Sequence, residues 1–328
     1  MKLGIIGSGM IVEDFLTVTP YLKDLELTAI YGRKSSQEKI EKLKDKYKIK
    51  NIFYDYNELL NSDVDTVYIA LPNNLHFDFA KRALEANKNA IIEKPMTSTY
   101  EQTLMLSNLA REKNLFIFEA ITNQYLPNYK KIKELIPSLG DIKIIQCNYS
   151  QYSSRYDSFK EGNTLPAFDP NFSGGALMDL NTYNIYYVVG LFGKPKNVEY
   201  YPNIEKGIDT SGVLILDYDK FKCVCIGSKD SKAPIANNIQ GDKGCIYQGS
   251  PANVCKNFKL IMNDGTTSLI NENKYEHRMV NEFIEFIDII KNKDLKKCYD
   301  ALENSLIVSE IQTIARKKGG IIFPEDNV

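Results

Sequence analysis

The feature that most constrains the fold is a regular alternation of strand-like and helix-like segments through the first 120 residues. Short apolar stretches such as KLGIIG, LELTAIYG, VDTVYIAL, NAIIEKP and LFIFEA are separated by longer stretches with helical periodicity. Strands joined through helices must run parallel, and their crossovers are right-handed. The sequence therefore predicts an α/β fold whose N-terminal part is a doubly wound parallel sheet.

After Pro127 the pattern changes. A long strand DIKIIQCNYSQYS is followed by a helix through GGALMDLNTYNIYYVVGLFG, and residues 197–270 are almost all strand-like. NDG at 263–265 predicts a hairpin turn, and two helices at about 276–291 and 299–317 end the chain. We expect a C-terminal α+β domain with a large, mostly antiparallel sheet. The expected domains are 1–122 and 123–328, and the last helix is free to pack on the first domain.

If the helices pack on one face of that second sheet, its other face must be buried against another part of the protein or another subunit. A partner subunit is the simplest cover, so we expect a homodimer or homotetramer formed through the C-terminal sheet. The formal net charge of -1, from 41 basic and 42 acidic residues, gives no indication of nucleic-acid binding, and no nucleic-acid partner is expected. No apolar run is long enough for a membrane helix.

Six cysteines occur without a C-x-x-C pair, and the two histidines lie far from them, so no metal site is expected. Cys223 and Cys225 alternate and should share one face of a strand. We interpret the cysteines as reduced thiols of a cytoplasmic protein. The N-terminus MKLGIIGSGM is interpreted as a first strand, because it has neither the long apolar region nor the cleavage site of a signal peptide.

A glycine pattern follows the first strand directly and opens a helix. Gly7 can form the tight turn, and Gly9 allows backbone amides to approach a pyrophosphate at the positive end of the helix. Val12 stands where the third glycine of the dinucleotide fingerprint is usual. This context predicts a Rossmann domain that binds a dinucleotide. The contacting residues of this turn are expected to be Gly7, Ser8, Gly9, Met10 and Ile11.

The second strand ends in AIYGRKSS, where an NAD site normally has a carboxylate for the ribose hydroxyl. Arg33 and Lys34 stand there instead, and both can pair with a 2'-phosphate. We therefore expect NADP to be preferred over NAD. The alternative is that the two residues are solvated charges at a helix start, where Ser35 or Ser36 is the expected cap.

Glu93, Lys94 and Pro95 follow a buried strand. Because ligands of an open parallel sheet bind beyond the carboxyl ends of its strands, Lys94 is expected to face the crevice for a nicotinamide. Pro95 restricts the backbone beside it. The alternative is an ordinary solvated loop.

These segments carry a family resemblance. GSGMI, ALPNNLHFDFAKRALEANKNAIIEKPMT, FEA and GGALMDLNTY resemble, in order and spacing, the Gfo/Idh/MocA oxidoreductases. The resemblance implies that Lys94 lies beside the nicotinamide and the substrate hydroxyl, and that Glu93 contacts the cofactor. It further implies a cofactor-binding loop with Leu71, Pro72, Asn73 and His76. For His76, a cap or packing role is the alternative.

In GGALMDLNTYN, Asp179 and Tyr183 are four residues apart, so on an α-helix they would share one face. Tyr183 replaces the acid/base histidine of many relatives, as in those similar to the dimeric dihydrodiol dehydrogenases. A free tyrosine has a pKa near 10, and the ammonium of Lys94 would stabilise its phenolate. The resemblance thus implies Lys94, Tyr183 and Asp179 as catalytic residues. Otherwise Asp179 is a helix charge and Tyr183 a core aromatic.

Gln124 occupies the position after FEA where relatives often carry an arginine, and we place it at the cofactor. Arg155 lies in the strand and loop that lead to the site, among aromatic residues suited to ring stacking. Either it binds substrate together with Lys94, Asp179 and Tyr183, or it makes a structural salt bridge.

The predicted reaction is hydride transfer between a nicotinamide cofactor and a hydroxyl or carbonyl carbon of a sugar, cyclitol or related polyol. Two alternatives are kept. One is an NAD-dependent glycoside hydrolase of the same fold, and the other is a nucleotide-sensing regulator without turnover.

Overall fold

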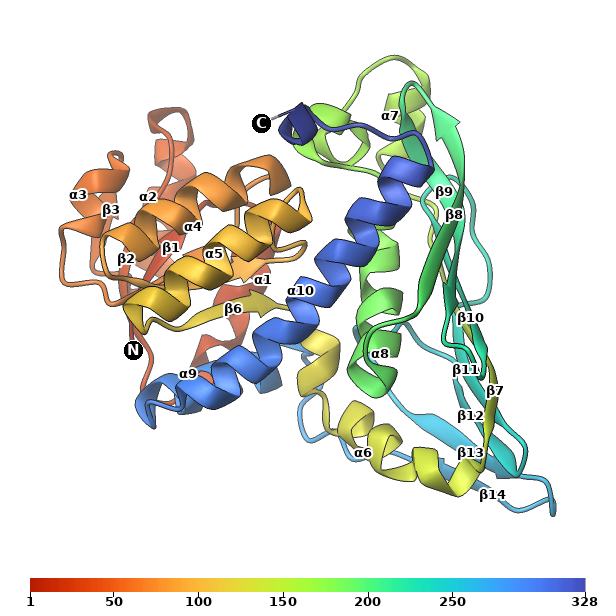
Figure 1. Ribbon diagram of the computed structural model, residues 1–328. Helices are drawn as coiled ribbons and strands as arrows, with labels where there is room; N and C mark the ends of the chain where they lie inside the picture. The colour runs from red at the N-terminus through yellow and green to blue at the C-terminus, as the bar shows by residue number, and fades with distance from the viewer. Residues whose placement is uncertain (328) are drawn as a thin grey trace. The chain divides into compact units, whose positions relative to one another are not determined.

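The computed structural model describes residues 1–327, which form two compact units (Figure 1). Unit 1 comprises Met1–Ala120 and Met279–Leu306, and unit 2 comprises Ile121–Arg278 and the chain from Ile307 onward. The expected combination of a Rossmann sheet and a second, mostly antiparallel sheet is confirmed.

Unit 1 is built on a six-stranded sheet in the order β3-β2-β1-β4-β5-β6, with every neighbouring pair parallel. The chain order reverses between β1 and β4, which is the switch point where ligands bind in such sheets. The strands are β1 (Lys2–Ile6), β2 (Glu26–Tyr31), β3 (Asn51–Phe53), β4 (Thr66–Ile69), β5 (Asn89–Glu93) and β6 (Ile117–Ala120). The helices are α1 (Met10–Val18), α2 (Gln37–Tyr47), α3 (Tyr56–Leu60), α4 (His76–Glu85), α5 (Tyr100–Lys113), α9 (Met279–Lys291) and the first part of α10 (Leu295–Lys318).

Successive residues of a strand point to opposite faces, so each buried strand of unit 1 contributes side chains to a core on either side of the sheet. Val67 of β4 joins the core that contains residues of α4 and α5. Its neighbour Tyr68 points the other way, where its ring lies 4.9 Å from that of Phe15 in α1 and 5.3 Å from that of Phe283 in α9. Apolar strands covered on both sides explain the near-continuous hydrophobic runs in the sequence.

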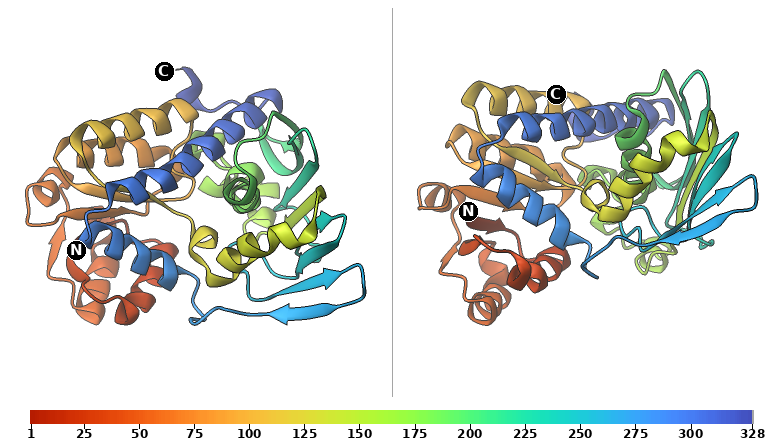
Figure 2. Two further views of the ribbon diagram at one scale, coloured as in Figure 1. Left: turned by 60° about the horizontal axis from the view of Figure 1, so that its bottom comes forward. Right: turned by 90° about the horizontal axis from the view of Figure 1, so that it is seen from below.

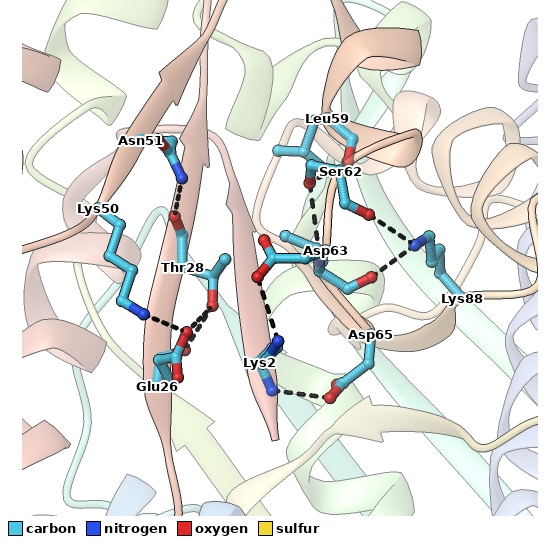
Figure 3. Close-up of polar contacts among 11 residues, drawn as sticks. Lys2, Glu26, Thr28, Lys50, Asn51, Leu59, Ser62, Asp63, Asp65 and Lys88 are labelled. Atoms are coloured by element: carbon cyan, nitrogen blue, oxygen red, sulfur yellow. Dashed lines mark hydrogen bonds and ion pairs between the residues drawn. The ribbon is translucent and has the colours of Figure 1, made fainter.

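The two edges of this sheet differ in how their charges are used. At the amino ends of the strands, Lys2 bonds Asp63 at 3.1 Å, Lys50 bonds Glu26 at 2.7 Å, and Lys88 donates to backbone carbonyls (Figure 3). These charges are paired within the unit. A ligand is therefore expected at the opposite edge of the sheet, beyond the carboxyl ends of the strands.

One expected helix cap is corrected. Ser36 does precede α2, but its side chain makes no capping hydrogen bond, because a short 3-10 turn at Lys34–Ser36 comes first. Thr99, by contrast, accepts from the Gln102 amide at the start of α5. The last two helices begin at Met279 and Leu295.

Unit 2 contains an eight-stranded sheet in the order β14-β13-β12-β11-β7-β10-β9-β8, in which β7 and β10 pair in parallel and the other pairs are antiparallel. The strands are β7 (Ile142–Ser150), β8 (Asn197–Glu205), β9 (Ile208–Asp217), β10 (Lys222–Ser228), β11 (Ala236–Gly241), β12 (Gly244–Gln248), β13 (Phe258–Met262) and β14 (Thr267–Ile270). The helices are α6 (Pro127–Leu135), α7 (Tyr156–Lys160), a π-helical segment at Leu177–Asn181, α8 (Thr182–Phe192) and the rest of α10. The predicted hairpin joins β13 to β14, with Gly265 at a φ of +92°.

The two faces of this second sheet differ in burial. Cys223 and Cys225 share the inner face, as expected, and pack in the core that includes residues of α8. On the outer face Tyr201 is 63% exposed and Leu269 66% exposed. In both views of Figure 2, helices of unit 2 lie against one side of the sheet.

Each of the six cysteines is a free thiol. Among residues 1–327, no helix combines the length and the apolar character needed to cross a bilayer. Within the same range, no cluster of three or more histidine, cysteine or acidic side chains is arranged to hold a metal ion.

Candidate functional site

The glycine turn of unit 1 is shaped by close backbone approach. Gly7 has a φ of +117° and donates its amide to the Tyr31 carbonyl at 2.9 Å. A methyl group on Gly7 would lie 2.5 Å from the Ala70 carbonyl oxygen, whereas one on Gly9 would meet nothing within 4 Å. Gly9 is exposed and forms the N-cap of α1. This open helix start fits a dinucleotide pyrophosphate. Ser8, Met10 and Ile11 belong to the same turn and first helical residues.

Arg33 and Lys34 lie just beyond the carboxyl end of β2, and both are exposed. Among residues 1–327, neither side chain takes part in an ion pair or hydrogen bond, in contrast to the paired lysines at the opposite edge. Their charges are thus available to a ligand, and an arginine guanidinium can bind phosphate through two parallel hydrogen bonds.

The Glu93–Pro95 segment is held by buried polar groups. The Tyr68 hydroxyl donates to Glu93 Oε1 at 2.5 Å, and Glu93 is 8% exposed. The Met96 amide donates to Glu119 Oε1 at 2.9 Å, so a second buried carboxylate fixes the chain after Pro95. Burial raises the pKa of Tyr68, and the neighbouring Glu93 acts in the same direction. Tyr68 is therefore a neutral hydrogen-bond donor.

His76 joins this segment to the loop after β4. Its Nδ1 lies 2.9 Å from the Pro95 carbonyl oxygen and its Nε2 2.9 Å from the Leu71 carbonyl oxygen, and the ring is fully buried. Burial lowers the pKa of His76, while the two carbonyl contacts act in the opposite direction. The ring thus connects two parts of the proposed cofactor loop through their backbone. Of the remaining loop residues, Pro72 is exposed and Asn73 half-buried.

The Asp179 segment of unit 2 is π-helical, so the α-helical spacing assumed for Asp179 and Tyr183 is corrected. The π segment ends at Asn181 and α8 begins at Thr182. The segment starts beside Asp209 of β9, whose carboxylate accepts from the Leu177 amide at 2.6 Å. A methyl group on Gly175, whose φ is +104°, would lie 2.1 Å from Asp209 Oδ1. The glycine therefore allows this carboxylate to reach the helix start.

Asp209 is itself fully buried, and this burial raises its pKa to about 6, although the Tyr200 hydroxyl and the Leu177 amide both favour the ionised form. The Tyr200 oxygen lies 2.7 Å from Asp209 Oδ2. Asp209 was not singled out from the sequence, since no motif marks it within IDTSGVLILD.

Lys229 is a second residue that sequence reasoning missed. Its ammonium lies 2.8 Å from Asp179 Oδ2 and donates to the Ala167 carbonyl at 2.6 Å. The side chain of Lys229 is 2% exposed and that of Asp179 36% exposed. Lys229 directly follows β10, and only the fold brings it to Asp179.

Tyr183 is 9% exposed, and its ring centroid lies 6.0 Å from that of Tyr149. The Asn123 side chain donates to the Tyr183 carbonyl at 3.1 Å. Arg155 is half-buried before α7, and among residues 1–327 its guanidinium makes no ion pair, so the salt bridge considered from the sequence is not observed there. Gln124 lies half-buried in the 3-10 turn at Thr122–Tyr125.

Comparison with known proteins places both units in one family. The pattern of the oxidoreductase family with an NAD-binding Rossmann fold (Gfo/Idh/MocA) matches residues 1–120, and that of the family's C-terminal domain matches residues 129–247. The chain is 34% identical over 328 residues to scyllo-inositol 2-dehydrogenase (NADP(+)) IolU of Bacillus subtilis (strain 168), covering 99% of each chain. It is 28% identical over 270 residues to trans-1,2-dihydrobenzene-1,2-diol dehydrogenase of Xenopus laevis, covering 79% of each.

The fold has a matching solved structure. KijD10, a 3-ketoreductase from Actinomadura kijaniata in complex with TDP-benzene and NADP, superposes with a TM-score of 0.82, covering 97% of each chain at 19% sequence identity. At this identity the similarity establishes the fold alone.

Proposed function

Because the chain belongs to the Gfo/Idh/MocA oxidoreductase family, whose N-terminal domain binds a nicotinamide dinucleotide, we propose that it is an NADP-dependent dehydrogenase of polyols. The reaction is reversible hydride transfer between the cofactor and a hydroxyl or carbonyl carbon of a sugar, cyclitol or related polyol. One relative that the chain covers to 99%, IolU, is named as a scyllo-inositol dehydrogenase, which makes cyclitols the first substrates to test.

The observation that carries the cofactor assignment is the carboxyl edge of the unit 1 sheet. An open glycine turn stands at the end of β1, and two cations without protein partners among residues 1–327 stand at the end of β2. Arg33 and Lys34 would bind the 2'-phosphate that distinguishes NADP from NAD. The relative IolU is named as NADP-dependent, which supports the same preference.

Other residues would contact the rest of the cofactor. We assign the pyrophosphate to the turn at Gly7–Gly9 and the first residues of α1. The loop of Leu71, Pro72 and Asn73 would line the nicotinamide half together with Glu93, Lys94 and Gln124. His76, with both ring nitrogens on backbone carbonyls, would act by holding Leu71 and Pro95 in place.

Proton transfer is assigned to Lys94 and Tyr183. Bound NADP supplies the hydride acceptor in oxidation and, as NADPH, the donor in reduction. In the oxidation, the Tyr183 phenolate accepts the proton of the substrate hydroxyl, and the Lys94 ammonium stabilises that phenolate. Asp179 accepts a hydrogen bond from a substrate hydroxyl, and Arg155 contacts the distal part of the substrate.

The proposed function is tested by a panel of cyclitols, aldoses and alditols incubated with NADP+. NADPH formation is followed by absorbance for the wild type, Lys94→Met and Tyr183→Phe. We expect oxidation of at least one cyclitol or sugar and a loss of about 100-fold or more in kcat for each variant, since general acid–base catalysis contributes about that much. Dihydroxyacetone-type ketoses and inososes with NADPH test the reverse direction. Turnover of none of these compounds in either direction would reject the proposal.

We also propose that two or more copies associate through the outer face of the unit 2 sheet. Tyr201, Val213, Ile144, Tyr247 and Leu269 place apolar side chains on that face from five different strands. An apolar surface of this kind on a sheet is typical of a protein–protein interface. The cytoplasmic location expected from the sequence stays a prediction, consistent with six free thiols.

A further inference from the structure

The π-helical segment Leu177–Asn181 is bonded to the second sheet at both of its ends. At its start, Asp209 Oδ2 of β9 accepts from the Leu177 amide at 2.6 Å. At its end, Asn181 Nδ2 donates to a backbone carbonyl of β10 at 3.2 Å. Asp209 is 1% exposed and Asn181 is fully buried. Asp179 lies between these two anchors, with 36% of its side chain exposed.

The anchor at the start contains a carboxylate in the interior of unit 2. Burial of an anion costs free energy unless hydrogen bonds offset it. Asp209 Oδ2 accepts a second hydrogen bond, from the Tyr200 hydroxyl at 2.7 Å. The backbone makes room for this contact, because a methyl group on Gly212 would lie 2.3 Å from the Tyr200 hydroxyl oxygen. One buried oxygen thus joins the start of the segment to two strands.

The anchor at the end is packed closely against β10. Asn181 Oδ1 accepts from the Asn184 side chain at 2.9 Å, and Asn184 also donates to the Ile226 carbonyl at 3.0 Å. A methyl group on Gly227 would lie 2.8 Å from Asn181 Cβ. This close approach leaves the end of the segment little room to move along the strand.

We propose that Asp209 and Asn181 are positioning residues for substrate binding, which hold the two ends of the π-helical segment and so fix the Asp179 carboxylate between them. This rests on the proposed function, in which that carboxylate accepts a hydrogen bond from a substrate hydroxyl. π-Helical turns are rare and occur frequently at functional sites. Because both anchors are buried, they act through the position of Asp179 and not by contact with the substrate.

Hydrogen exchange measured by mass spectrometry tests the anchoring without turnover. The variants are Asp209→Ala and Asn181→Ala, with Asp217→Asn, at a more accessible carboxylate of the same strand, as the matched control. Each of the first two variants should speed amide exchange in residues 176–182 about tenfold or more, since one lost hydrogen bond changes a local opening equilibrium by about that factor. Asp217→Asn should leave it unchanged. Asp209→Asn, which keeps an oxygen for the Leu177 amide, should exchange more slowly than Asp209→Ala.

Steady-state kinetics test the link to the substrate. KM for the best polyol should rise about tenfold in Asp209→Ala and in Asn181→Ala, as for one lost hydrogen bond, while kcat stays within about threefold. Asp209→Asn should restore most of the affinity. In an Asp179→Ala background, which lacks the carboxylate, neither change should raise KM further. NADPH binding, followed by tyrosine fluorescence, should be that of the wild type in every variant.

Asn181→Ala decides the proposal alone if Asp209→Ala does not fold. Unchanged exchange in residues 176–182 would show that the segment does not depend on these anchors. Faster exchange with an unchanged KM, or an equal rise of KM in the Asp179→Ala background, would overturn the positioning role. If the wild type oxidises no polyol, the proposed function fails, and the exchange measurement still decides whether Asp209 and Asn181 hold the segment.

Discussion

The hydroxyl of Tyr68 lies 2.5 Å from Oε1 of Glu93, and both side chains are buried in unit 1. The two residues come from the neighbouring strands β4 and β5. Tyr68 also packs its ring against Phe15 and Phe283, which limits the movement of its hydroxyl. Glu93, the last residue of β5 and the neighbour of Lys94, is therefore positioned by the interior of the sheet.

Tyr68→Phe removes this hydroxyl and keeps the ring contacts. Because Glu93 loses a charge-assisted hydrogen bond, unfolding in denaturant should show a loss of about 1–2 kcal/mol. NADPH affinity, measured by fluorescence titration, should fall several-fold. Tyr47→Phe, at a half-buried position in α2, is the control and should change neither quantity. Wild-type affinity and stability in Tyr68→Phe would refute the assigned role.

His76→Ala removes both carbonyl contacts and leaves a cavity at a fully buried position. We expect a stability loss of about 2–4 kcal/mol, from the lost packing and the lost hydrogen bond that the ring N–H donates to a backbone carbonyl. The Kd for NADPH should rise as well, since Leu71 and Pro95 are no longer connected. His277→Ala, at the chain's other histidine, provides the control. A loss of stability with unchanged NADPH binding would show that His76 contributes to packing and not to the cofactor site.

Asp209 predicts a pH dependence of stability. Its folded pKa of about 6 lies above the ordinary value near 3.9, so between these values the native state binds more protons than the unfolded state. The stabilisation is complete below pH ~4 and is lost as the pH rises through ~6, a difference of up to ~3 kcal/mol. Denaturant unfolding from pH 4 to 7 should show this decline in the wild type and not in Asp209→Asn. Asp264→Asn, at an exposed turn, should retain the decline. A decline of equal size in Asp209→Asn would contradict the assignment.

Association through the unit 2 sheet predicts a mutational effect on size in solution. Leu269→Glu and Tyr201→Glu place a charge on its most exposed apolar positions. Light scattering after size exclusion should give a multiple of 37.4 kDa for the wild type and a smaller mass for the variants. Tyr21→Glu, at an exposed position of unit 1, should not change the mass. A wild-type mass of one chain would exclude the proposed oligomer.

The architecture could be predicted because its signals are local. Alternating apolar runs and helical stretches define the parallel sheet, and the positive φ of Gly7 belongs to a turn that the glycine pattern alone identifies. NDG likewise marks the β13–β14 hairpin. In each case the physical cause lies within a few residues of the pattern.

The supporting residues of the site could not be predicted, because their partners are distant in sequence. Lys229 meets Asp179, and Asp209 meets the Leu177 amide, only once β9 and β10 lie beside the π-helical segment. That segment was expected to be α-helical, since side-chain periodicity does not reveal one added residue in a turn. The sequence pattern around Tyr68 indicates only a buried strand and not its hydrogen bond to Glu93.

The proposed hydride transfer between NADP and a polyol at the carboxyl edge of unit 1 is tested by kcat/KM for NADP+ and NAD+ with the best polyol. These values are measured in the wild type and in Arg33→Ala, with Lys39→Ala, at a salt-bridged lysine, as control. We predict a preference for NADP+ that falls about 10- to 100-fold in Arg33→Ala, as expected for a lost charge-assisted contact, with NAD+ values unchanged. Equal use of both cofactors, unaffected by Arg33→Ala, would contradict the NADP assignment, and absence of turnover with either would contradict the claim as a whole.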